Sequence, residues 1–186
     1  LYMTEGRSIL IKAEGFEFFG LGKIGGIPVP VYIFAAVIVI GTLLLKKFTI
    51  GRKILAIGSN AKGAWYSGIN VTMTTIAAYI IAGLTASTAA VILSSKLMSA
   101  ASTLGEGMEL DAIAAVVIGG TSLAGGNGYI VGTIAGSLII EVISNWMTLQ
   151  SVNPFLRNVV KGAIILLALL IDNIRRGKLT KNEFAA

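Results

Sequence analysis

Two carboxylates lie close together in the sequence and raise the question of acid–base catalysis. Glu109 and Asp111 are two positions apart at what we expect to be the start of a helix. Side chains with this spacing point in diverging directions, whereas glycoside hydrolysis needs two carboxyl groups that face one bond. At a helix start, carboxylates meet the positive end of the helix dipole. We therefore favour a structural role for both residues over direct contact with a substrate.

Most residue types that build hydrolase and metal sites are missing from this chain. The sequence has no Cys and no His, which excludes a Cys nucleophile, disulfides and the usual zinc sites. The glycine-rich segment 119–128 (GGTSLAGGNG) lacks the Lys of a GxxxxGK[ST] phosphate loop, so we interpret it as a tight turn between helices. We expect no bound metal, no cofactor and no enzymatic activity.

The composition indicates that the surroundings of the chain are largely apolar. Of its 186 residues, 55% are hydrophobic and 13% are charged, against about 25% charged residues in an average soluble domain. The net charge of +6 is compatible with nucleic-acid binding, but the basic residues interrupt long apolar runs instead of gathering on one soluble face. We predict an all-α, polytopic membrane helix bundle, in contact with lipid and not with nucleic acid.

Four segments are apolar and long enough to suggest membrane crossings, and a fifth is inferred. The four are 29–45, 71–97, 129–146 and 158–171. The fifth, 108–123, is short and is interrupted by Gly119 and Gly120. Within 129–146, Gly132 and Gly136 have the GxxxG spacing that allows helices to approach closely in lipid.

The distribution of charge predicts the orientation of a single membrane domain, residues 1–186. The connection 46–70 has five basic residues and no acid, and the tail 172–186 is also basic, so both are predicted to be cytoplasmic. Residues 1–28 are then external. A cytoplasmic C-terminus requires an odd number of crossings after residue 97, which makes 108–123 a crossing and gives about five transmembrane helices. The alternative is a re-entrant 108–123 with an external C-terminus.

Ionisable residues within the predicted spans are expected to be paired or hydrated, because an isolated charge in a bilayer is costly. Glu141 and Lys161 lie at similar depths in adjacent antiparallel spans, so we predict that they form an ion pair or face an aqueous cavity. The polar residues that we consider candidates for the solute pathway are Glu109, Asp111, Thr121, Ser122, Glu141, Asn145 and Lys161.

The basic connection 46–70 also contains a predicted short helix. Ser59 or Asn60 can cap a helix over 61–67, and Gly68 can end it in a left-handed turn. Its exposed apolar side chains would be Trp65, Tyr66 and Ile69. The residues themselves leave two uses open, docking to a soluble partner or lying among lipid headgroups.

Three blocks of sequence carry a resemblance to a known family. They are GRKILAIGSNAKGAWYSGINV (51–71), ELDAIAAVVIGGTSLAGGNGYIVGTIAGSLII (109–140) and VVKGAIILLALLID (159–172). Over about residues 27–176 the chain resembles the permease subunit of bacterial ABC importers of the ribose and simple-sugar type. The second block is specific to that group, whereas the first is shared with permeases for branched-chain amino acids and nucleosides. The resemblance implies that this chain is the C-terminal half of such a permease.

The resemblance also implies a role for the short cytoplasmic helix, which is to couple the permease to an ATPase. The implied coupling residues are Asn60, Ala61, Ala64, Trp65, Tyr66, Ser67, Gly68 and Ile69. Implied partners are cytoplasmic ABC ATPase subunits that bind the ATP and Mg²⁺, a second permease copy in a homodimer or heterodimer, and a periplasmic or lipoprotein solute-binding protein. The expected location is the bacterial inner membrane.

The implied function is import of a small polar solute, such as the monosaccharide ribose, into the cytoplasm. Permeases for nucleosides or branched-chain amino acids are alternatives in the same class, and a membrane enzyme or a non-transporting structural subunit is an alternative in another. Trp65, Glu141 and Trp146 depart from the pattern that the resemblance implies, since smaller residues are more usual at these positions.

Overall fold

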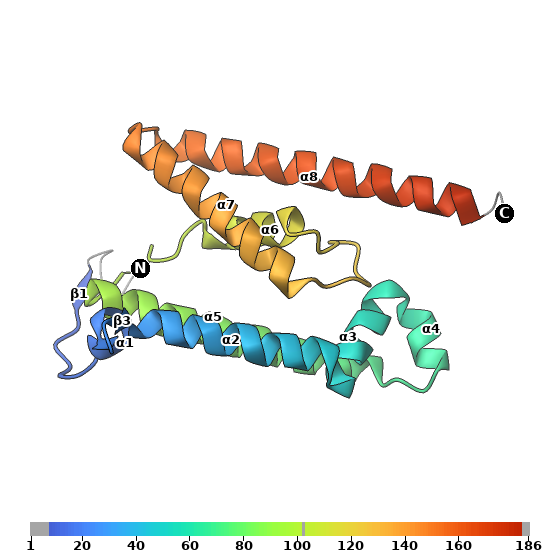
Figure 1. Cartoon of the computed structure of the whole chain (residues 1–186), viewed down its shortest axis with the longest axis horizontal. Helices are drawn as coiled ribbons and strands as arrows, with labels where there is room; N and C mark the ends of the chain where they lie inside the picture. The colour runs from blue at the N-terminus through green and yellow to red at the C-terminus, as the bar shows by residue number, and fades with distance from the viewer. Residues whose placement is uncertain (1–7, 102, 184–186) are drawn as a thin grey trace. The chain divides into compact units, whose positions relative to one another are not determined.

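Most of the chain is helical, and the computed structural model describes residues 8–101 and 103–183 (Figure 1). The helices are α1 (Phe18–Leu21), α2 (Val29–Lys46), α3 (Thr49–Ser59), α4 (Ala61–Tyr66), α5 (Val71–Leu97), α6 (Met108–Ile118), α7 (Ile130–Leu149) and α8 (Pro154–Glu183). The strands are β1 (Ile9–Leu10), β2 (Lys23–Ile24), β3 (Ile27–Pro28) and β4 (Ser99–Ala100), which form two separate antiparallel pairs, β1 with β4 and β2 with β3. The predicted all-α membrane helix bundle is confirmed.

The helices belong to two compact units of the chain. One unit contains the residues up to Ile54 together with Gly63–Glu106, and the other contains Leu55–Lys62 together with the residues from Gly107 onward. α3 therefore contributes its first part to one unit and its last part to the other. The prediction that residues 1–186 act as one membrane domain stays a prediction.

Three helices in the described part of the chain are long and apolar enough to cross a membrane, namely α2, α5 and α7. α2 begins where Pro28 and Pro30 lack main-chain N–H groups, which an α-helix does not use in its first turn. Few residues of α2 and α5 are fully buried within the chain. In a membrane, these apolar surfaces are left for lipid or for other helices.

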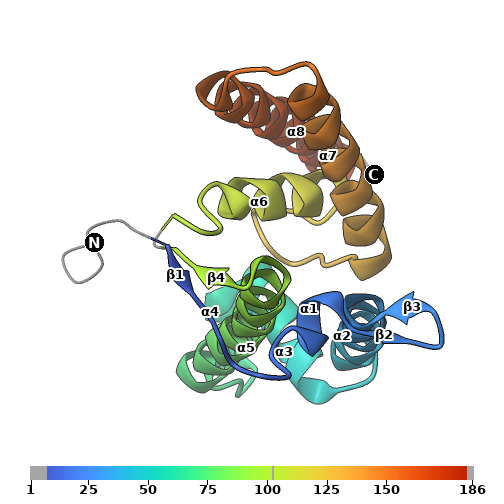
Figure 2. The same ribbon diagram turned by 90° about the vertical axis from the view of Figure 1, so that its left-hand side faces the viewer.

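The two ends of α5 are closed in different ways. At the start, the Asn70 side chain accepts a hydrogen bond from Met73 N at 3.0 Å and so caps the helix. At the other end, Met98 has a left-handed backbone with φ of 48°, and its N–H donates to the carbonyl oxygens of Ser94 and Ser95. The buried Ser95 hydroxyl of the last turn donates to the carbonyl oxygen of Phe16 at 2.5 Å. α1 lies against this last turn of α5 and also contacts α2, as Figure 2 shows. Gly20 in α1 has no room for a Cβ, because main-chain atoms of Lys96 occupy that space.

In the second unit, α6 packs against both α7 and α8. A Cβ at Gly132 would overlap the carbonyl oxygen of Gly119, and one at Gly136 would overlap that of Ala115. The two main chains are therefore in direct contact, which confirms the close approach expected from the GxxxG spacing. Around this contact, Ala114, Ala115 and Ile140 form the buried core of the unit.

The length of α6 bears on the predicted number of crossings. It has 11 residues, or about 16 Å at the 1.5 Å rise of an α-helix, against about 30 Å of hydrocarbon. α6 by itself is thus too short to span, and the count of five crossings stays a prediction. α8 contains the predicted span 158–171 and has 30 residues, so its length is sufficient.

The predicted orientation in the membrane is not tested by helix geometry. Residues 1–7 of the predicted external segment and residues 184–186 of the predicted cytoplasmic tail lie outside the described residues. Residues 8–28 lie at the C-terminal end of α5 through the contacts of α1 and β1, whereas α4 precedes its N-terminal end. This arrangement is compatible with placing 8–28 and 46–70 on opposite sides of the membrane.

Candidate functional site

The short helix predicted over 61–67 is present as α4. It ends when Gly68, with φ of +79°, donates its N–H to the carbonyl oxygen of Trp65 at 3.0 Å. The N–H of Ile69 returns to the carbonyl oxygen of Ala64, also at 3.0 Å. These bonds close the C-terminal end of the helix in the left-handed turn expected at Gly68. The chain then enters α5 through the Asn70 cap.

α4 presents its two aromatic side chains outward. Trp65 and Tyr66 are 63% and 80% exposed, and their rings meet edge to face with centroids 5.1 Å apart. Ala64 is buried on the opposite side, and Ile69 is half-buried. A cavity of about 330 Å³ lies in the bend between α4 and α5, lined by Trp65, Gly68, Ile69, Asn70, Val71 and Thr72. Exposed Trp and Tyr side chains are common both at protein interfaces and among lipid headgroups, so both predicted uses of α4 stay open.

The glycine-rich segment 119–128 forms the connection between α6 and α7. Gly120, Gly125 and Gly126 all have positive φ, which side-chain-bearing residues rarely adopt. Thr121 Oγ1 accepts a hydrogen bond from Tyr129 N at 3.0 Å across the base of this turn. The predicted location between two helices is confirmed, but the connection runs over residues 119–129 and is longer than a tight turn. The main chain of the turn also contacts Gly58 at the end of α3, so closely that Gly125 has no room for a Cβ.

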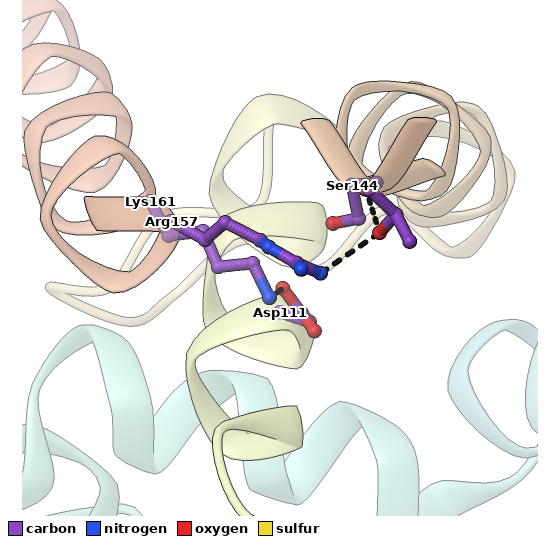
Figure 3. A network of polar contacts seen from close by, with 5 residues as sticks. Asp111, Ser144, Arg157 and Lys161 are labelled. Carbon is purple, nitrogen blue, oxygen red and sulfur yellow. Dashed lines mark hydrogen bonds and ion pairs between the residues drawn. The ribbon is translucent and has the colours of Figure 1, made fainter. Parts of the chain in front are cut away.

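A charged contact joins α6 to α8 in the second unit. The Nζ of Lys161 lies 2.6 Å from Oδ1 of Asp111 (Figure 3). The Lys161 side chain is 12% exposed and the Asp111 side chain 32% exposed. Asp111 also lies in the first turn of α6 with Glu109, at the positive end of the helix dipole, as predicted. The carboxylate of Asp111 is therefore stabilised both by the helix start and by a neighbouring cation.

A second cation of α8 reaches α7 beside this ion pair. Arg157 donates from Nη1 to Thr148 Oγ1 at 2.8 Å and from Nε to the carbonyl oxygen of Val152 at 3.0 Å. Thr148 in turn donates to the carbonyl oxygen of Ser144 at 2.8 Å. Figure 3 shows Arg157 and Lys161 extending from the same helix toward this cluster. We call Asp111, Ser144, Thr148, Arg157 and Lys161 the polar cluster.

The predicted ion pair between Glu141 and Lys161 is wrong, whereas the alternative, that both residues face an aqueous cavity, stays a prediction. Lys161 contacts Asp111, whereas Glu141 has an exposed side chain on α7. The reason for the difference is the packing of α6 against α8, which brings the carboxylate of Asp111 to Lys161. Among the described residues, Glu141 makes no ion pair.

The other candidates for the solute pathway are spread over several places. Ser122 is buried in the turn after α6, and Asn145 is exposed on α7. Glu109 is exposed at the start of α6. Among the predicted pathway residues, the structure thus brings together Asp111 and Lys161. It does not assign a solute contact to any of them.

Sequence reasoning missed three members of the polar cluster, which are Ser144, Thr148 and Arg157. A signal for Arg157 existed, because it precedes Lys161 by four positions and so shares a helix face with it. Ser144 and Thr148 also have i, i+4 spacing on α7. Hydroxyl residues are common in these helices, so this spacing alone does not distinguish them.

Comparison with known proteins agrees with the sequence resemblance. The model of a family described as the branched-chain amino acid transport system / permease component matches residues 3–169. The ribose import permease protein RbsC of Bacillus subtilis is 51% identical over 174 residues, which cover 92% of this chain and 54% of that protein. Its Escherichia coli K12 namesake is 46% identical over 87% of this chain and 50% of that protein.

A relative named for another sugar also matches. The L-arabinose transport system permease protein AraH of Escherichia coli K12 is 37% identical over 94% of this chain and 53% of its own length. The chain thus spans about half the length of the curated relatives that it matches. No solved structure matches it.

Proposed function

The chain belongs to the family of the branched-chain amino acid transport system / permease component, and from this premise we propose that it is part of the transmembrane permease subunit of an ATP-driven sugar importer. The observation that carries the proposal is the identity of 51% and 46% to two ribose import permease proteins over most of this chain. The relatives named for ribose and L-arabinose favour a monosaccharide over a branched-chain amino acid or a nucleoside.

In this proposal, ATP hydrolysis takes place on separate ATPase subunits, and α4 is the cytoplasmic coupling helix that they bind. α4 supports this role because it exposes Trp65 and Tyr66 outside the predicted spans, beside a cavity that a partner side chain can enter. Only four residues connect α4 to α5. This connection is held at one end by the bond from Ile69 N to Ala64 O and at the other by the Asn70 cap, so a movement of α4 would be passed directly to α5. The partner would bias the transport cycle through its different affinity for the two conformations.

The orientation of α4 is part of the proposal, and single cysteines can test it. The chain has no native Cys, so an introduced thiol is unique. Tyr66→Cys is the better position than one at Ala64, because Tyr66 is exposed and Ala64 is buried. We expect an impermeant thiol reagent added outside intact cells to leave Tyr66→Cys unmodified and to label Lys23→Cys, in the predicted external segment. Ready labelling of Tyr66→Cys from outside the cells would contradict the cytoplasmic location of α4.

The coupling role is tested by co-purification with an ATPase identified by its GxxxxGK[ST] motif. Trp65→Arg and Ile69→Asp place charge on the proposed contact, so we expect both to abolish co-purification and uptake. Phe48→Arg is the matched control, since Phe48 is an exposed aromatic residue in the same connection but outside α4. Loss of the ATPase in all three variants would indicate a general defect and not a specific contact.

The solute class is tested by uptake into cells that express the complete system. We expect ribose to accumulate and to compete with arabinose, whereas leucine and uridine do not enter. Uptake of leucine alone would replace the sugar proposal with transport of branched-chain amino acids. Uptake of none of these compounds, with the ATPase bound, would favour a non-transporting structural subunit.

A further inference from the structure

A second cavity lies beside the basic connection, between the first part of α3 and the start of α5. Its volume is about 200 Å³, and its lining residues are Thr49, Ile50, Lys53, Asn70, Met73 and Thr74. All six belong to the first unit. The cavity is separate from the one beside Trp65, apart from the shared Asn70. We call it the α3–α5 pocket.

The lining of the α3–α5 pocket combines one cation with hydrogen-bonding and apolar groups. Lys53 is exposed and provides an ammonium group, Thr49 provides a hydroxyl, and Ile50 and Met73 are apolar. The connection 46–70 has five basic residues and no Asp or Glu, so Lys53 has no acidic neighbour along this stretch of sequence. A site with this charge favours an anion over a neutral solute.

The surroundings of the pocket indicate that the anion belongs to an amphiphile. α2 ends at Lys46 shortly before the pocket, and α5 begins in its wall, and both are long and apolar enough to span a membrane. The pocket therefore lies at the end of two candidate spans, at the level where lipid headgroups are found.

An exposed apolar stripe leads away from the pocket along α5. Met73 in the pocket wall is followed by Ile76, Ile80 and Leu84, and all four side chains are exposed. Their spacing of three and four positions puts them on one face of the helix. A soluble anion would use the polar end of this arrangement alone, whereas a phospholipid would place its phosphate by Lys53 and an acyl chain along the stripe.

From these observations we propose that the α3–α5 pocket binds the phosphate headgroup of an anionic phospholipid, with Lys53 as its cationic contact. Lys53 and Thr49 would hold the phosphate, and Ile50 and Met73 would contact the glycerol and the first acyl carbons. Basic pockets between membrane helices bind anionic headgroups in this way. The bound lipid would join α3, which precedes α4, to the start of α5. The proposal depends on the membrane location of the chain and not on which solute it carries.

The test is lipid retention by the whole chain, extracted from nanodiscs that contain equal amounts of phosphatidylglycerol and phosphatidylcholine, and measured by native mass spectrometry. We expect wild type to retain phosphatidylglycerol selectively, and Lys53→Gln to retain about fivefold less, which corresponds to about 1 kcal/mol per basic residue near a membrane surface. Lys53→Arg keeps the charge and should retain the lipid. Lys62→Gln is the matched control, because it removes the same charge from the same connection but lies outside the pocket.

Three outcomes would overturn the proposal. Equal losses in Lys53→Gln and Lys62→Gln would show that lipid responds to the overall charge of the connection and not to the pocket. Equal retention of phosphatidylcholine and phosphatidylglycerol would show that no anion is selected. The third outcome combines two results, namely that millimolar inorganic phosphate displaces the lipid completely and that Met73→Ser retains as much lipid as wild type. Together they would identify a site for free phosphate instead. If Lys53→Gln does not fold, Met73→Ser still decides the question, because the proposal expects this variant to retain less phosphatidylglycerol than wild type.

Discussion

Breaking the contact between Asp111 and Lys161 should destabilise the packing of α6 on α8 by a measurable amount. Removing one partner of a fully buried ion pair costs about 3–5 kcal/mol, because it leaves a buried charge unpaired, whereas an exposed pair contributes about 0–1 kcal/mol. Lys161 is 12% exposed and Asp111 32% exposed, so the pair lies between these limits. We therefore expect Lys161→Met and Asp111→Asn each to lower the free energy of unfolding by about 2 kcal/mol.

The double variant separates this pairing from the intrinsic cost of each substitution. If the two side chains act through each other, Asp111→Asn combined with Lys161→Met should lose about as much as either single variant, which gives a coupling energy of about 2 kcal/mol. The measurement is reversible unfolding by sodium dodecyl sulfate in mixed micelles, followed by circular dichroism. Losses that add within about 0.5 kcal/mol would refute the reasoning. Glu141→Gln is the control, and because Glu141 is exposed and outside the pair we expect a change within about 0.5 kcal/mol.

Three further substitutions test local packing by the same unfolding measurement. Gly132→Leu should lower the free energy of unfolding by about 3 kcal/mol or more, because its side chain would occupy the space of Gly119. Gly162→Ala adds a Cβ in open space, so it should leave the free energy of unfolding unchanged or raise it. Asn70→Ala should cost about 1 kcal/mol by removing the α5 cap, and Asn70→Asp should restore it. Ser95→Ala should lower the free energy of unfolding by about 1 kcal/mol, because it removes the hydrogen bond from α5 to the Phe16 carbonyl oxygen. Wild-type stability would show that this bond contributes nothing measurable, since Phe16 O keeps its bond from Phe19 N.

Local signals in the sequence were sufficient for the elements whose causes are local. The apolar runs predicted α2, α5 and α7, and the glycine after Trp65 and Tyr66 predicted the end of α4. These features depend on the length of an apolar segment, on a cap or on a residue that accepts positive φ, and all three can be recognised in a few neighbouring positions.

The pairing of charges was not predictable from the same signals, because it depends on which helices meet. Glu141 and Lys161 were matched by depth in two neighbouring spans, and Asp111 was assigned to the dipole of its own helix. Because α6 packs against α8, Asp111 lies at the start of its helix and also pairs with Lys161. Lys161 therefore does not pair with Glu141. Contacts between segments far apart in the sequence depend on the tertiary arrangement, which a single sequence does not specify.

The contact of Gly58 with the turn at Gly125 and Gly126 has a consequence for how the molecule responds to its ionic surroundings. The atoms that meet are the main chain of Gly58, Gly125 and Gly126 and the uncharged side chain of Ser59, so this contact has no charged group for ions to screen. Raising the salt concentration should weaken the partly exposed Asp111–Lys161 contact while this attachment persists. High salt would thus weaken the ion pair between α6 and α8 and leave the contact between α3 and the glycine-rich connection unchanged.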